Sequence, residues 1–242
     1  MILGTNLAGT SRVLFNGVAA KFEMVSKTEI ATSVPSGATS GTVEVLSRSG
    51  KLLSNVPFQV TSNGCSSGSN VMIYNNLGSS TDAFDYTNGW LISGPSSPLG
   101  NQQWIGYPFT ATENHTATEI DAAVFYYGAD GQAGNNFNFG IWSDAGGVPG
   151  TELNGTDVSN LSTWTGTSGD CCNTQNAIIA ATPLTAGTQY WVVLSTDGNG
   201  LNSLGVWDNV YNDAVGSQAY NVGSGWITEQ VTTSAFAVCG SN

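Results

Sequence analysis

The chain has 242 residues, only 9% of them are charged, and its formal net charge is −12. Lys, Glu, Arg and Gln are scarce whereas Val, Ile, Thr, Tyr, Phe and Trp are common, which favours strands and turns over helices. No apolar run is long enough to predict a membrane-spanning helix, and the sequence lacks the basic face that nucleic acid requires.

The charges are divided unevenly along the chain. Five basic and three acidic residues give the first 61 positions a charge of +2, whereas the later positions contain 14 acidic residues and no Lys or Arg. This acidity favours solubility, divalent-cation binding, or attraction between the unlike ends of neighbouring copies. The basic residues are Arg12, Lys21, Lys27, Arg48 and Lys51.

The N-terminal segment predicts about six short strands without helical periodicity. Ile2 and Leu3 have the pattern of a strand end, and a turn over residues 4–9 leads into a strand that ends at Asn16-Gly17, a strong tight-turn signal. Alternation of apolar and polar residues continues in "AAKFEMV" and "TVEVLS", and "VPFQVT" completes the segment.

Several short motifs of this segment match one family. They are "GTNL" at 4–7, Val13, "FNG" at 15–17, "VP" at 34–35, "GA" at 37–38, Gly41 and "FQV" at 58–60. Residues 1–61 resemble an IPT/TIG domain on this basis, which implies a small immunoglobulin-like sandwich. Such domains normally start with a strand, a Pro/Gly-rich turn and a complete second strand. Here the first strand is absent, and the second is present only as Ile2-Leu3.

Residues 62–70, rich in Ser, Gly and Asn, predict a short linker. About nine or more strand candidates follow within residues 71–242, among them "NFNFGIWSD" and "QYWVVLST", a spacing that predicts a jelly-roll type of β-sandwich. The predicted fold class is all-β: a truncated immunoglobulin-like sandwich followed by a larger jelly-roll-type β-sandwich.

Three motifs of the second domain are "QQWIGYPFTATENHTATEIDAAVF", "NFGIWSDAGGVPGTEL" and "LTAGTQYWVVLS". With them the domain resembles the choice-of-anchor type of bacterial extracellular domain, most closely its R subtype. The resemblance implies an extracellular or cell-surface location and no assigned chemistry. The chain ends in "CGSN" instead of a surface-anchoring tail, so anchoring is not expected to carry over.

The four cysteines are Cys65, Cys171, Cys172 and Cys239, an even number that suggests an oxidising, extracellular setting. A Cys65–Cys239 bridge with a vicinal Cys171–Cys172 pair is the favoured connectivity, and a bridge from Cys65 or Cys239 to the adjacent pair is the alternative. No secretory signal is visible, and we expect that the given chain starts downstream of the true start.

No catalytic constellation is predicted. The lone His115 in "TENHTAT" is expected to be a solvated loop residue, and no G-x-S-x-G motif occurs. Close acid pairs such as Asp82 with Asp85, or Glu119 with Asp121, are expected by chance in so acidic a domain. The protein is therefore predicted not to be an enzyme, and a Cys/His zinc site is not expected with one histidine.

Calcium is the one cofactor that the sequence favours, because Asp and Asn oxygens in flexible loops are its usual ligands. The loops "GADGQAGNN", "STDGNGLN" and "WDNVYND" have this composition, although plain polar turns explain them equally. The candidate ligands are Asp130, Asn135, Asp197, Asn199, Asp208 and Asp213.

Trp90, Trp164 and Trp226 are flanked by Gly, Thr or Asn and are candidates for exposed rings that bind carbohydrate. The alternative is that they pack in the core or in a subunit interface. A secreted carbohydrate-binding module is accordingly the second functional hypothesis.

The first hypothesis is a non-catalytic structural subunit of a bacterial extracellular filament or cell-surface assembly. An open edge at Ile2 and Leu3 would accept a strand from another copy, so that copies join head to tail. The candidate donor is the C-terminal segment "VTTSAFAVCGSN", with Phe236 and Val238, or an edge strand of the acidic domain. A longer polypeptide that supplies the missing strand itself is the alternative.

Overall fold

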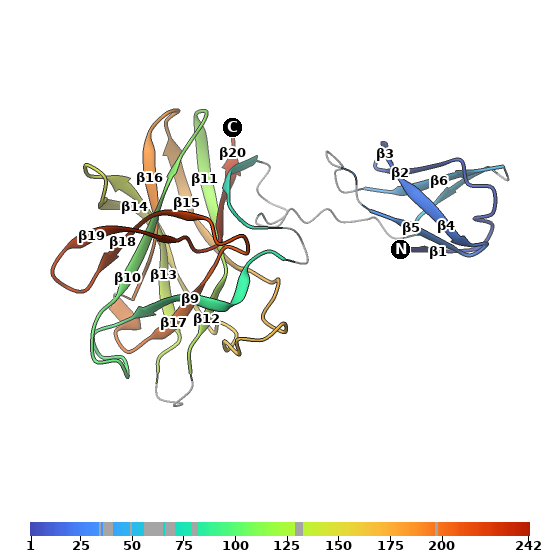
Figure 1. Ribbon diagram of the computed structural model, residues 1–242. Coiled ribbons are helices and arrows are strands. Elements are labelled where there is room, and N and C mark those ends of the chain that lie inside the picture. The colour runs from blue at the N-terminus through green and yellow to red at the C-terminus, as the bar shows by residue number, and fades with distance from the viewer. Residues whose placement is uncertain are drawn as a thin grey trace. The chain divides into compact units, whose positions relative to one another are not determined.

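The computed structural model describes residues 1–33, 35, 41–48, 50–55, 65, 71–78, 82–128, 133–196 and 198–242. The chain divides into two compact units, Met1–Thr61 and Ser62–Asn242 (Figure 1). Apart from the 3-10 turn Gly198–Gly200, every regular element in these ranges is a strand. The predicted all-β class and β-sandwich architecture are confirmed.

The first unit contains two antiparallel sheets. One has the strand order β1-β5-β4 and the other β3-β2-β6-β7. The bounds are β1 Ile2–Leu3, β2 Arg12–Phe15, β3 Val18–Ala20, β4 Phe22–Ser26, β5 Glu29–Thr32, β6 Val43–Ser47 and β7 Gly50–Leu53. Asn16 and Gly17 both have positive φ, 45° and 87°, as a two-residue hairpin between β2 and β3 requires.

A small apolar core lies between these two sheets. Its buried residues are Leu7, Val13, Phe15, Ile30, Val43 and Val45. The alternation in β6, where Val43 and Val45 are buried and Glu44 between them is not, follows the period of a half-buried strand. The "GA" and "FQV" motifs and the Val of "VP" lie outside the described residues.

The second unit contains three antiparallel sheets. A six-stranded sheet has the order β14 (Pro149–Ser159), β13 (Asn136–Asp144), β16 (Gln189–Ser195), β10 (Trp104–Thr110), β18 (Val215–Asn221), β19 (Trp226–Thr232). A four-stranded sheet has the order β15 (Gln175–Leu184), β11 (His115–Ala122), β20 (Phe236–Ser241), β8 (Val71–Asn75). A three-stranded sheet has the order β12 (Val124–Tyr126), β17 (Leu204–Asn209), β9 (Asp85–Ser93).

The main core of this unit combines side chains from the two larger sheets. Phe109 of β10 and Phe139 of β13 belong to the same buried cluster as Ile120 of β11 and Val238 of β20. Such shared burial between two sheet faces is the packing of a β-sandwich.

The turn between β13 and β14 is held by Asp144. Its carboxylate accepts hydrogen bonds from the backbone N–H of Gly146 (3.1 Å) and from Trp191 Nε1 and Gln189 Nε2 (2.8 Å each). Gly146 and Gly147 have φ of 77° and 91°, which glycine adopts without strain. The "SDAGGVPG" motif thus serves the fold, because it fixes this turn against β16.

A second apolar cluster, here called the satellite cluster, covers the opposite face of the four-stranded sheet. In β20, Ala237 and Cys239 belong to it, whereas the alternating Phe236 and Val238 point into the main core. The satellite cluster consists of Leu77, Ala83, Phe84, Ala123, Phe125, Val210, Ala235, Ala237 and Cys239. Both faces of this sheet are therefore covered around β11 and β20.

Candidate functional site

The first unit has an apolar groove of about 420 Å³. Leu7, Val43 and Val45 of the core line it, so it reaches between the two sheets. Leu3 and Leu53 also line it and are 72% and 58% exposed, values unusual for leucine. The groove thus joins the core to an exposed apolar rim.

The groove follows the edges of both sheets. β1 is the terminal strand of its sheet and pairs with β5, with Ile2 opposite Ile30 and Leu3 opposite Glu29. β7 is the terminal strand of the other sheet and pairs with β6. Ile2 and Leu3, the predicted acceptor residues, therefore lie at a sheet edge beside the groove.

The predicted donor segment occupies a different environment. Phe236 and Val238 are 1% and 0% exposed, and β20 pairs with β11 on one side and β8 on the other. The prediction that this segment is a free donor strand is wrong, because releasing it would break two strand ladders and open the main core. Edge strands of the second unit, such as β14 and β19, remain as candidates.

The cysteines form the two favoured pairs, and no thiol is free. Cys65 precedes β8 and is joined to Cys239 of β20 across a sequence separation of 174 residues, with 5.6 Å between the Cα atoms. Cys171 and Cys172 are joined to each other across a cis peptide. Cys65 and Cys172 both pack against the satellite cluster.

Buried acids surround the same cluster. Glu119, Asp121 and Asp208 are 0% exposed, and Asp170 is 7% exposed. The sequence has no Lys or Arg after position 51, so the second unit contains neither to pair with them. Burying a carboxylate without a counter-charge is costly unless hydrogen bonds, a proton or a bound cation offset the lost hydration.

Glu119 and Asp121 form a linked pair on one face of β11. Asn176 of β15, which lies opposite Asp121, donates hydrogen bonds to the carboxyl groups of both Asp121 and Glu119. Burial, and then the charge of Glu119, raises the pKa of Asp121 to about 7. The sequence-based interpretation of this pair as coincidental missed its burial.

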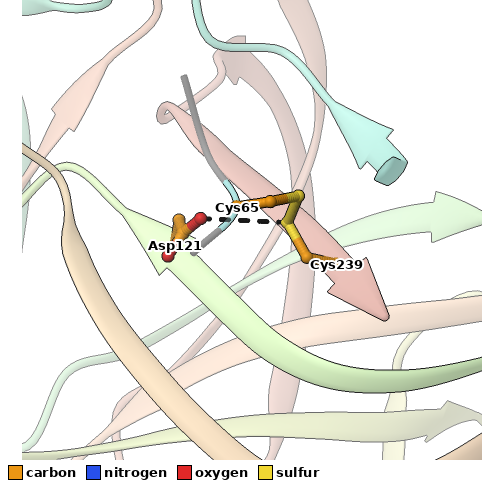
Figure 2. A group of neighbouring side chains, drawn as sticks. All are labelled: Cys65, Asp121 and Cys239. Atoms are coloured by element: carbon orange, nitrogen blue, oxygen red, sulfur yellow. Dashed lines mark hydrogen bonds between the residues drawn. A yellow bond between two sulfur atoms is a disulfide. The ribbon is translucent and has the colours of Figure 1, made fainter. Parts of the chain in front are cut away.

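Asp121 of this pair lies beside the Cys65–Cys239 disulfide (Figure 2). Cys239 is directly opposite Glu119 in the β11–β20 ladder, and its Sγ atom is 3.8 Å from Asp121 Oδ2. Figure 2 shows the Asp121 carboxyl group pointing toward the bridge from the neighbouring strand. Two sulfur atoms and a carboxyl group thus share one buried position.

Asp208 is another buried acid, separate from the Glu119–Asp121 pair. Burial raises the pKa of its carboxyl group to about 8, and the charges of Asp170 and Asp85 add to this effect. The nearby Trp164 indole acts in the opposite direction, but neither Asp208 oxygen reaches hydrogen-bond geometry with a partner in the described part of the chain. Burial therefore favours the protonated form of Asp208 at neutral pH.

Four of the six predicted calcium ligands lie in the described residues. Asp130 and Asp197 lie outside the described residues. Asn135 uses its side chain to bind the backbone of Leu161, and Asn199 and Asp213 are exposed. Among the described ranges, the one group of possible metal ligands is Cys65, Asp121 and Cys239, which includes none of the six candidates.

The three candidate tryptophans are half-buried, which agrees with the packing alternative. Trp90 packs against the main core and donates a hydrogen bond from Nε1 to the Thr232 carbonyl (3.1 Å). Trp164 packs against the satellite cluster, and Trp226 contacts Trp142 with 5.8 Å between ring centroids. They pack against different clusters, which removes the basis for a shared sugar platform.

His115 differs from its prediction. It is 8% exposed and begins β11, so it is not a solvated loop residue. Its Nδ1 atom has no hydrogen-bond partner within the described ranges.

A scan against protein-family models finds no match to this chain, and a search of curated proteins finds no significant match. None of the described segments forms a helix long and apolar enough to cross a membrane.

Proposed function

We propose that the protein is a non-catalytic structural subunit of a bacterial extracellular filament or cell-surface assembly, in which the first unit of one copy receives a β-strand from the next. The groove of about 420 Å³ beside β1 and β7 carries this proposal. It combines exposed leucines with the edges of two sheets. An added strand would pair with a sheet edge through main-chain hydrogen bonds and would cover the leucines through apolar contacts.

The proposed occupant is a second copy of the chain. The first 61 residues have a charge of +2 and the rest of the chain has −14, so the groove-bearing unit of one copy attracts the acidic unit of another. The groove and an edge strand of the acidic unit are different surfaces, so the contact is heterologous. A heterologous contact that does not close generates a filament.

β19 is the proposed donor, because it can pair edge to edge without leaving its own sheet. It terminates the six-stranded sheet, and its Ile227 is 45% exposed. The disulfides support the extracellular setting, since such bonds persist in oxidising compartments.

Sedimentation velocity and electron microscopy of the full chain test this proposal. The wild-type chain should form polymers that grow with concentration and shrink with salt, because salt screens the attraction between units. Leu3→Asp with Leu53→Asp places charge in the groove and should leave single copies. Leu99→Asp, at another exposed leucine (47%), is the matched control and should polymerise as wild type does.

Polymers that persist in the double variant would contradict the groove as the acceptor, and a wild-type chain that stays a single copy would contradict the assembly. Cross-linking a mixture of isotopically heavy and light chains distinguishes the source of the strand. Mixed-isotope links at β1 or β7 are expected. Links confined to one isotope would show that the groove is filled by the same polypeptide.

Glycan binding remains a second candidate because of one small pocket in the second unit. Its volume is about 220 Å³, and Asp82, Tyr211 and Asn212 line it, with Tyr211 55% exposed. An exposed ring beside amide and carboxyl groups suits a sugar. Glycan-array binding that Tyr211→Ala abolishes would favour this function, whereas array binding unaffected by this change would exclude the pocket.

A further inference from the structure

Figure 2 shows three potential metal ligands close together, two of which are the sulfur atoms of the disulfide. The Sγ atoms of Cys65 and Cys239 and a carboxyl oxygen of Asp121 all lie within 4.8 Å of one another. Atoms that bind one zinc ion at about 2.0–2.3 Å are at most about 4.6 Å apart. Small side-chain adjustments therefore suffice for all three to reach one ion.

Glu119 is a candidate fourth donor, because residues directly opposite each other in a ladder lie on the same face of the sheet. Glu119 lies directly opposite Cys239 in the strand ladder, and Asn176 bridges the carboxyl groups of Glu119 and Asp121. Glu119, Asp121 and Cys239 are 0% exposed. The two acids thus project from a paired strand, which fixes their positions, and a shared amide orients them as an outer partner orients metal ligands.

The donor chemistry depends on the oxidation state of sulfur. In the disulfide, neither sulfur is a thiolate, so the cluster lacks its strong ligands. Two equivalents of a small thiol convert the bridge to two cysteine thiols and are themselves oxidised to a disulfide. Metal binding then releases the thiol protons, and thiolates select zinc over the hard cations calcium and magnesium.

We propose that the reduced form of the protein binds one zinc-class divalent ion through Cys65, Cys239 and Asp121, with Glu119 as the fourth ligand. Cys65 is then connected to Cys239 of β20 in either redox setting. The connection is a disulfide when the two cysteines are oxidised and a metal ion when they are reduced. The ion also supplies the positive charge that the second unit lacks beside these acids. This inference is independent of filament assembly.

Cobalt titration of the full chain tests the proposal, with Co²⁺ as the probe for a zinc-class site. The reduced chain, kept without oxygen, should bind one equivalent and show thiolate-to-cobalt charge-transfer absorption, whereas the oxidised chain should not. Asp121→Asn should weaken binding by at least about tenfold. Asp157→Asn, at an exposed acid of β14, and the double variant Cys171→Ser/Cys172→Ser should bind as wild type does.

Near-UV circular dichroism keeps the test decisive if the reduced chain unfolds. In that case Co²⁺ should restore the folded spectrum, because ligand binding is then coupled to folding. A reduced chain that is folded without the charge-transfer band would overturn the proposal. So would an unfolded reduced chain that Co²⁺ does not refold, or binding that Asp121→Asn leaves unchanged.

Discussion

The two units of this protein differ in how completely their apolar cores are covered. The first has one small core, and a groove reaches that core between the edges of its sheets. The second has a main core, a satellite cluster on the opposite face of the four-stranded sheet, and a disulfide across 174 residues. Small domains bury a smaller fraction of their surface, so an uncovered groove matters more in the first unit.

The difference extends to electrostatics. The first unit contains all the basic residues, and Lys51 pairs there with Glu44 near the surface. The second unit instead buries its acids without Lys or Arg. The second unit therefore has a well-covered core but buries acids without basic partners. The first unit has an ordinary surface charge pair but a core that a groove reaches.

The largest expected effect concerns one of these buried acids. Because folding raises the pKa of Asp208 from 3.8 to about 8, the folded state binds an extra proton between these values, and stability falls as pH rises through them. Four pKa units correspond to about 5 kcal/mol. Asp208→Asn should therefore raise the free energy of unfolding by up to about 5 kcal/mol above pH 8 and leave it unchanged below pH 4.

Urea unfolding across this pH range measures the effect, and tryptophan fluorescence follows the second unit alone because all 7 Trp lie in it. Asp157→Asn is the control and should follow the wild-type curve at every pH. An identical pH dependence in Asp208→Asn and wild type would show that Asp208 is not the group responsible.

The next largest effect is expected from removing the disulfide that joins the two ends of the second unit. Cys65→Ser with Cys239→Ser should lower the free energy of unfolding of the second unit by about 4–5 kcal/mol in the chain-entropy model. The double variant Cys171→Ser/Cys172→Ser is the matched control, since it opens no long loop and should cost far less. Equal losses from the two changes in urea unfolding would refute this expectation.

A core truncation tests how independent the first unit is. Ile30 is 0% exposed beside β1, and Ile30→Ala should cost about 2–5 kcal/mol, a large part of what a small core supplies. Hydrogen exchange should accelerate throughout residues 1–55, while the tryptophan unfolding curve stays unchanged. A shift of that curve would mean that the two units unfold together.

The smallest effect concerns the turn between β13 and β14. Asp144→Ala removes the acceptor for Trp191, Gln189 and two glycine N–H groups and should cost about 1–2 kcal/mol. Hydrogen bonding from Trp191 and these groups lowers the pKa of Asp144, so its contribution is lost only as pH falls below the ordinary value. Equal wild-type and variant stability at neutral pH would contradict this role.

Local signals in the sequence predicted local structure well. Asn16-Gly17 specified a hairpin, alternation in "TVEVLS" specified a half-buried strand, and the positions of the four cysteines indicated their pairing. Each depends on neighbouring residues or on a simple count. The strand class of the fold followed from the same kind of evidence.

Non-local packing accounts for what the sequence did not predict. Glu119 and Asp121 look solvent-facing in "HTATEID", but Cys65 and the satellite cluster cover that face. The central position of β20 is also non-local, because nothing in "FAVCGS" tells an edge strand from an inner one. The absence of Lys and Arg after position 51 was the available signal that buried acids would need another neutralising group.

Because β20 is an inner strand near the end of the sequence, the four-stranded sheet can be completed only late in synthesis. Translation proceeds toward the C-terminus, and the four-stranded sheet stays incomplete until residues 236–241, which lie between β11 and β8, have left the ribosome. At about 5–20 residues per second, the ribosome needs about 10–40 s to go from the end of the first unit to β20. Throughout that interval the first unit has its whole sequence available, while the second unit still lacks an inner strand of its four-stranded sheet.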